Sequence, residues 1–127
     1  MLSTLLKSAL ATVIATTLST PAIAQITNLT VSMDGAQANA GAGTGSPATG
    51  NASVTFDAGT NQLSWNITWS GLTGVPTVMH FHGPAMANQN GGVQVNTGVV
   101  GPPVNGSIVI SAGQASDLLA GLWYLNL

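Results

Sequence analysis

The sequence predicts an all-β domain, an antiparallel Greek-key β-sandwich or barrel with one short helix. Beyond its N-terminal segment, the chain is rich in Val, Thr, Ile, Gly and Asn. Apolar and polar residues alternate there in short runs that turn residues separate, a pattern typical of sandwiches and barrels. The chain contains no cysteine, so no disulfide supports the fold. We therefore expect its stability to come from strand pairing and packing.

The clearest strand is expected over residues 62–70, where every second residue is apolar. Residues 52–57 alternate in the same way, and the connection DAGTNQ supplies Gly and Asn for a tight turn. The two runs are therefore predicted to form a hairpin in which Phe56 packs near Leu63 or Trp65. The apolar face of the second strand consists of Leu63, Trp65, Ile67 and Trp69.

An earlier strand is predicted over residues 27–33, with Leu29, Val31 and Met33 directed inward. It is followed by a stretch of Gly, Ala and Ser through residue 51, whose side chains are too small to form a core. We expect this stretch to be a long flexible loop.

The second half of the sequence predicts shorter elements. VQVN and GSIVIS are typical of short strands, and the intervening Gly-Pro-Pro at 101–103 interrupts regular structure. SAGQASDLLAG is the one helix candidate, with Ser111 as its N-cap and Gly121 as the residue that ends it. The final run, LWYLNL, is typical of a core strand.

The first 24 residues resemble a secretory signal. Lys7 supplies the positive charge, an apolar stretch follows, and Ala22-Ile23-Ala24 forms a small-x-small cleavage site. The apolar stretch is shorter than the roughly 20 residues that span a bilayer. We therefore expect a signal peptide at 1–24, one domain at 25–127, and a secreted or periplasmic location without membrane insertion after cleavage.

The composition excludes several classes of partner. Lys7 is the only basic residue, so residues 25–127 contain no Lys or Arg, and their acidic residues are Asp34, Asp57 and Asp117. Without basic residues, no counterion release drives nucleic-acid binding and no attraction to anionic lipids arises. Other secreted or cell-surface proteins are the partners that we expect, and the sequence does not identify them.

The segment VMHFHGPA contains both histidines of the chain. In an extended strand, His80 and His82 point to one side, about 6.8 Å apart along the chain, while Met79 and Phe81 point to the other. Two interpretations remain open at this point. The imidazoles could ligate a metal ion, or they could lie on the solvent side of the strand and form hydrogen bonds with neighbouring loops.

Three segments resemble a known family in their order and spacing. MHFHGPA, GGVQV and DLLAGLWYLNL are similar to the HIHGPA motif, the following strand and the LLAGxxYVNxHT motif of the CHRD domain, named from chordin. This resemblance implies an immunoglobulin-like sandwich in an extracellular protein. In the family, a His-Thr and a Gly-Glu-Ile-Arg-Gly-Gln strand follow Tyr-x-Asn, so the resemblance also suggests that the sequence is a fragment lacking a closing strand.

These observations favour a non-enzymatic binding or structural module. The sequence contains no G-x-S-x-G nucleophile elbow, and Asp34 and Asp57 each occur at a predicted turn. Trp65, Trp69, Trp123 and Tyr124 are expected in the core. The alternative is a copper-binding protein resembling copper/zinc superoxide dismutases, whose copper-binding strand also carries His-x-His; here His80 and His82 would be the metal ligands.

Overall fold

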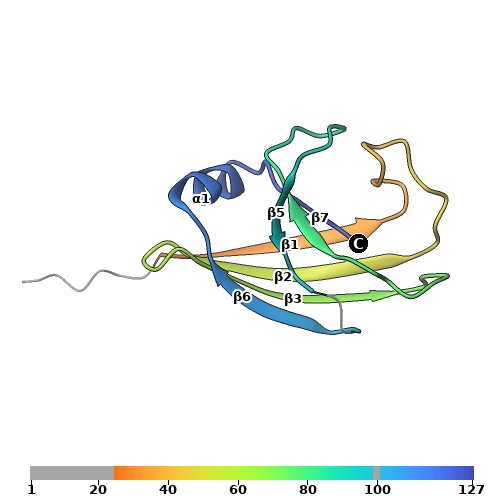
Figure 1. Cartoon of the computed structure of the whole chain (residues 1–127), viewed down its shortest axis with the longest axis horizontal. Coiled ribbons are helices and arrows are strands. Elements are labelled where there is room, and N and C mark those ends of the chain that lie inside the picture. Colours follow the sequence, from red (N-terminus) through yellow and green to blue (C-terminus); the bar gives the residue numbers. More distant parts are fainter. Residues whose placement is uncertain (1–24, 99–100) are drawn as a thin grey trace, which may run out of the picture.

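The fold consists of two antiparallel sheets that pack face to face, with one short helix at an end (Figure 1). The computed structural model describes residues 25–98 and 101–127, so the expected signal peptide at 1–24 lies outside the described residues. One sheet has the strand order β1-β2-β3-β6 and the other the order β5-β4-β7. The elements are β1 (Ile26–Asp34), β2 (Thr49–Asp57), β3 (Gln62–Ser70), β4 (His80–His82), β5 (Val93–Asn96), β6 (Val104–Val109), α1 (Ala112–Leu119) and β7 (Tyr124–Asn126). The predicted all-β sandwich with one short helix is confirmed.

The four-stranded sheet, called here the large sheet, is regular along its length. Its ladders contain no register shift, and the predicted hairpin joins β2 to β3 with Phe56 opposite Leu63. In the turn between them, Asp57 Oδ1 accepts a hydrogen bond of 2.8 Å from the amide of Gly59. Asn61 has a positive φ of 55°, a conformation that Asn tolerates better than most residues. The turn residues therefore fix the register that the alternating side chains require.

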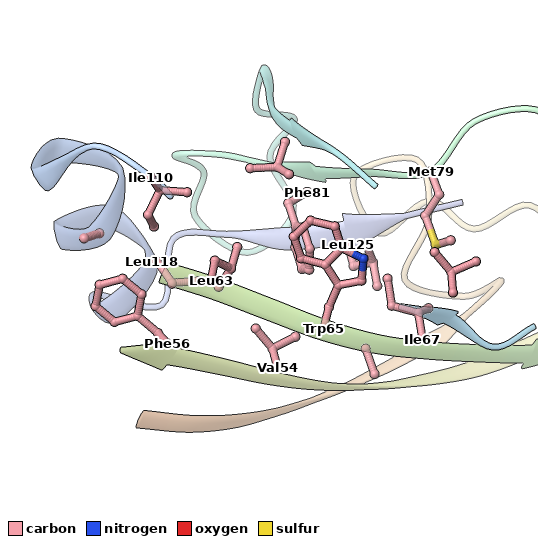
Figure 2. Close-up of a cluster of buried hydrophobic side chains, with 14 residues drawn as sticks. Val54, Phe56, Leu63, Trp65, Ile67, Met79, Phe81, Ile110, Leu118 and Leu125 are labelled. Carbon is pink, nitrogen blue, oxygen red and sulfur yellow. The ribbon is translucent and has the colours of Figure 1, made fainter. Parts of the chain in front are cut away.

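The core lies between the two sheets and extends beneath α1 (Figure 2). Trp65 of β3 meets Phe81 of β4 edge to face, with ring centroids 5.7 Å apart, an arrangement that aromatic pairs favour. Gly106 on β6 leaves room for the indole, since a Cβ there would lie 2.5 Å from Trp65 Cζ2. The buried apolar residues are Ala52, Val54, Phe56, Leu63, Trp65, Ile67, Met79, Phe81, Val95, Val104, Ile110, Ala115, Leu118 and Leu125.

The first two strands extend further than their side chains predict. β2 begins at Thr49, opposite Asp34, three residues before the predicted start. Backbone pairing with β1 continues there although the residues are small, because the ladder needs main-chain groups and not bulky side chains. The remaining Gly/Ala segment at 35–48 folds back on itself, with the Thr44 amide donating to Gly35 O at 2.9 Å.

Helix α1 has both of the predicted caps. The Ser111 hydroxyl accepts a hydrogen bond from the Gln114 amide at 3.1 Å, and the Gln114 side chain accepts one from the Ser111 amide at 3.0 Å. This reciprocal pair is a capping box. At the other end, Gly121 has a φ of 75°, and its amide donates to Leu118 O. The caps hold an eight-residue helix that buries Ala115 and Leu118 against the core.

Candidate functional site

Strand β4 has one buried face and one partly exposed face, as the sequence predicts. Met79, which immediately precedes β4, is fully buried, and Phe81 is 3% exposed. His80 and His82 are half-buried on the opposite side of the strand. The predicted orientation of these four residues is confirmed, and it places both imidazoles on the outer face of the small sheet β5-β4-β7.

Apart from Val93, which lies opposite His82 across the register shift, strand pairing surrounds the histidines with uncharged polar groups. His80 lies opposite Asn96 of β5 and Asn126 of β7, while His82 lies opposite Tyr124 of β7. Paired residues of an antiparallel ladder direct their side chains to the same side of the sheet. These five residues therefore share the outer face of the small sheet, and we call them the His–Tyr face.

The three rings of the His–Tyr face are neighbours. The centroids of His80 and His82 are 5.5 Å apart, with their planes inclined at 58°. His82 stacks on Tyr124, with a centroid separation of 5.2 Å and an interplanar angle of 14°. Stacking of an imidazole on a phenol restricts the side-chain freedom of both residues. The face thus presents an ordered row of rings above a buried core.

A loop carbonyl fixes the ring of His82. Its Nδ1 lies 3.0 Å from Gly91 O, and since a carbonyl only accepts, Nδ1 carries the proton in this hydrogen bond. The Gly91 amide in turn donates to the Tyr124 hydroxyl at 3.1 Å. Residue 91 must be small because a Cβ there would lie 2.8 Å from Gly83 Cα. In the neutral ring, this leaves Nε2 of His82 as the nitrogen with a free lone pair.

The structure corrects the assignment of one aromatic residue. Trp65 is buried in the core as predicted, and Trp69 and Trp123 are partly buried against the core. Tyr124, however, joins the His–Tyr face instead of the core. The alternation along β7 is the signal that could have revealed this, since Leu125 is buried and the residue before it must face the other way.

The carboxylates of Asp34 and Asp57 serve turns, as expected, and neither is paired with a residue of the His–Tyr face. Asp34 Oδ1 accepts from the amides of Ala36 and Gln37, both at 2.9 Å, and Oδ2 accepts from the Gln37 side chain at 2.8 Å. The side-chain hydrogen bond from Gln37, supported by the backbone amides, lowers the pKa of Asp34 below its usual value of 3.8.

Within residues 25–98 and 101–127, no three His, Cys, Asp or Glu side chains gather closely enough to hold a metal ion.

The fold and this face define a small antiparallel β-module with a polar ring cluster on its three-stranded sheet. The family model of the CHRD domain matches residues 29–127, and the chain belongs to the CHRD domain family. CHRD domains occur in extracellular proteins. No curated protein and no solved structure matches the chain. None of the helices in the described part of the chain is long and apolar enough to cross a membrane.

Proposed function

We propose that the chain is an exported, non-enzymatic binding module, secreted or periplasmic, which recognises other secreted or cell-surface proteins through the His–Tyr face. The observation that carries this proposal is the division of β4 between its two faces. Phe81 packs into the core, whereas His80, His82 and Tyr124 form an ordered, half-exposed row. Ordered aromatic rings lose little conformational entropy on binding, which is why such residues are enriched at protein interfaces.

The surroundings of the imidazoles support binding over catalysis. Histidine that acts as a general base in hydrolysis is usually oriented by a carboxylate and lies beside a nucleophile. Here the residues opposite His80 are Asn96 and Asn126, and a backbone carbonyl orients His82. These neutral partners hold the rings in place, and among the described residues no carboxylate is paired with either imidazole.

A loss-of-binding experiment tests the recognition surface. Labelled mature protein is added to cells of the producing organism, and retention is compared before and after protease treatment of the cell surface. Replacing both His82 and Tyr124 with Ala should abolish protease-sensitive retention. The matched control is Asn51→Ala, an exposed residue on the outer face of the large sheet. Equal retention of the double variant and the control would disprove the assignment.

Export is tested separately by mass spectrometry of the protein recovered outside the cytoplasm. The Ala22-Ile23-Ala24 site predicts a mature N-terminus at Gln25. An exported protein that still carries Lys7 would show that the segment is an anchor and not a signal peptide.

A second candidate function is copper binding by His80 and His82, and the hydrogen bond at His82 favours it. Histidines that ligate metals commonly donate their other ring N–H to a backbone carbonyl or carboxylate, which fixes the ring orientation. His82 donates Nδ1–H to Gly91 O, and its Nε2 is free. The neighbouring ring of His80 is a second nitrogen donor on the same face. Imidazole is a preferred ligand of copper.

A Cu(II) titration at neutral pH distinguishes the two candidate functions. The binding-module proposal predicts no saturable signal. One-to-one binding with a micromolar or lower Kd, lost in both His80→Ala and His82→Ala but kept in Asn51→Ala, would establish the copper function instead.

A further inference from the structure

The chain contains two Asn-Gly pairs, Asn90-Gly91 and Asn105-Gly106. Asparagine is one of the chemically labile residues. Its side chain loses nitrogen when the backbone amide of the next residue attacks the side-chain carbonyl, and a following glycine leaves that approach unhindered because it has no Cβ. The structure places the two pairs in different surroundings and so distinguishes their reactivity.

Strand β6 restrains the pair Asn105-Gly106. The two residues lie opposite Asn66 and Trp65 of β3, and the Asn105 side chain accepts a hydrogen bond from the side chain of Asn66. The Trp65 indole also packs directly over Gly106. Ring closure at Asn105 would require the strand to leave this ladder and this packing. We therefore expect Asn105 to react slowly.

The pair Asn90-Gly91 lies in the irregular segment that joins β4 to β5 (Figure 1). Asn90 is exposed and belongs to neither a strand nor a helix. Gly91 is required by packing, because a Cβ there would lie 2.8 Å from Gly83 Cα and 2.9 Å from Gly83 N. The packing of Gly83 therefore demands, after an exposed asparagine, the residue that makes this asparagine most reactive.

The His–Tyr face holds the group that would attack. The Gly91 amide donates a hydrogen bond of 3.1 Å to the Tyr124 hydroxyl. Attack requires this amide to lose its proton and to turn toward the Asn90 side chain, and both changes break the hydrogen bond. The Gly91 carbonyl is held as well, by Nδ1 of His82 at 3.0 Å. The reactive pair is thus directly connected to two rings of the face.

We propose that Asn90-Gly91 is a site of spontaneous deamidation, which the Tyr124 hydroxyl slows and whose product alters the His–Tyr face. The Gly91 nitrogen gives its proton to water and forms a bond to Asn90 Cγ, and the side-chain nitrogen leaves as ammonia. Water then opens the cyclic imide. Opening at Cγ gives aspartate at position 90, and opening at the backbone carbonyl gives isoaspartate, in which the backbone runs through the side chain.

Either product changes the surroundings of His82. Both add a carboxylate one residue from the carbonyl that binds its ring, whereas the three acidic residues of the chain belong to β1, β2 and α1. Isoaspartate also adds a carbon to the backbone before Gly91, which shifts the amide that Tyr124 holds. The effect on recognition rests on the proposed function, but the reaction itself does not.

Mass spectrometry of the mature protein tests the site. In mildly alkaline buffer, which favours loss of the amide proton, the protein should gain about 1 Da as an amide becomes a carboxylate. Tandem mass spectrometry should locate the gain at Asn90. Asn90→Gln should abolish it there, because the longer side chain closes a ring less readily, whereas the control Asn105→Gln should leave it unchanged. No gain at Asn90, or an equal rate at Asn105, would overturn the proposal.

The restraint is tested with Tyr124→Phe, which keeps the ring that stacks on His82 and removes only the hydroxyl. Asn90 should then react about fivefold faster, the change that corresponds to the loss of one typical hydrogen bond. Ser53→Ala, which removes a hydroxyl from the large sheet, is the control and should react at the wild-type rate. Equal rates in Tyr124→Phe and wild type would refute the restraint.

The effect on the face is tested in the cell-retention experiment with fresh and fully reacted protein. Reacted protein should lose protease-sensitive retention, and Asn90→Gln incubated in the same way should keep it. Equal retention of fresh and reacted protein would refute the effect on the face. The mass measurement involves no cells, so a failure of the recognition proposal, seen as no retention of fresh protein, is distinguished from a failure of the deamidation proposal.

Discussion

The two sheets of this domain differ in regularity, and in the proposed function this difference separates stability from recognition. In the large sheet, β1, β2 and β3 have nine residues each and pair without a register shift. In the small sheet, the strands have three or four residues, and the pairing of β4 with β5 shifts between Phe81 and His82. The large sheet supplies seven of the fourteen buried apolar residues, whereas the small sheet carries the half-exposed rings of the His–Tyr face.

The comparison shows how one short strand can serve both purposes. β4 is only three residues long, yet Phe81 contacts Trp65 and Trp123 through its ring, and the flanking histidines point away. Because strand side chains alternate, a His-x-His motif automatically places an anchoring residue between two outward-facing ones. Predictions that disturb each face separately therefore test this division.

The largest expected effect is at the buried face of β4. Phe81→Ala should reduce the free energy of unfolding by about 3–5 kcal/mol, because it removes a ring packed between two indoles and leaves a cavity. Denaturant unfolding of the mature protein measures this. A loss below about 1 kcal/mol would show that the small sheet contributes little to the core.

An added strand should stabilise the open side of the sandwich. Leu29, Val31 and Met33 point toward the core but are only partly buried, whereas Val54 on the next strand is 2% exposed. Appending the family-like His-Thr…Gly-Glu-Ile-Arg-Gly-Gln tail after Leu127 should cover the groove between β1 and β7. Each kcal/mol gained should raise Tm by about 4–8 °C. A tail of scrambled sequence is the control, and equal Tm values would contradict the expectation.

A smaller effect is expected at the cap of α1. Ser111→Ala removes the hydroxyl that accepts from the Gln114 amide and should cost about 1 kcal/mol. Ser116→Ala, at an exposed position within the helix, serves as the control and should leave the unfolding midpoint nearly unchanged. An equal loss in both variants would mean that helix propensity, and not the cap, determines the effect.

The smallest expected effect is the titration of Asp34, which is exposed. Hydrogen bonds from Gln37 lower the pKa of Asp34 in the folded protein. The stabilisation from Asp34 is therefore fully present above the pKa that Asp34 has in the unfolded chain. It is lost as the pH falls through the lower pKa of the folded protein. An NMR titration should give a pKa below 3.8, and Gln37→Ala should raise it. An unchanged pKa in that variant would contradict the assigned cause.

The alternation of apolar residues predicted the strands well where the side chains are large. Residues 62–70 and both faces of β4 follow the pattern, because burial on one side of a sheet enforces a period of two. The start of β2 at Thr49 could not be predicted this way, since main-chain pairing with β1 extends into small residues. Alternation along β7 could have shown that Tyr124 faces away from the core, but its stacking on His82 depends on the pairing of β7 with β4, two strands that are distant in sequence.

The measurement that tests the central claim most directly is the unfolding free energy of the double variant His80→Ala/His82→Ala. If these side chains serve recognition, their removal should cost about 1 kcal/mol, chiefly the hydrogen bond from His82 to Gly91. Circular dichroism in a denaturant series, with Phe81→Ala measured alongside, gives the comparison. A loss of about 3 kcal/mol or more, equal to that expected for Phe81→Ala, would show that the outer face of β4 is structural and would contradict the account.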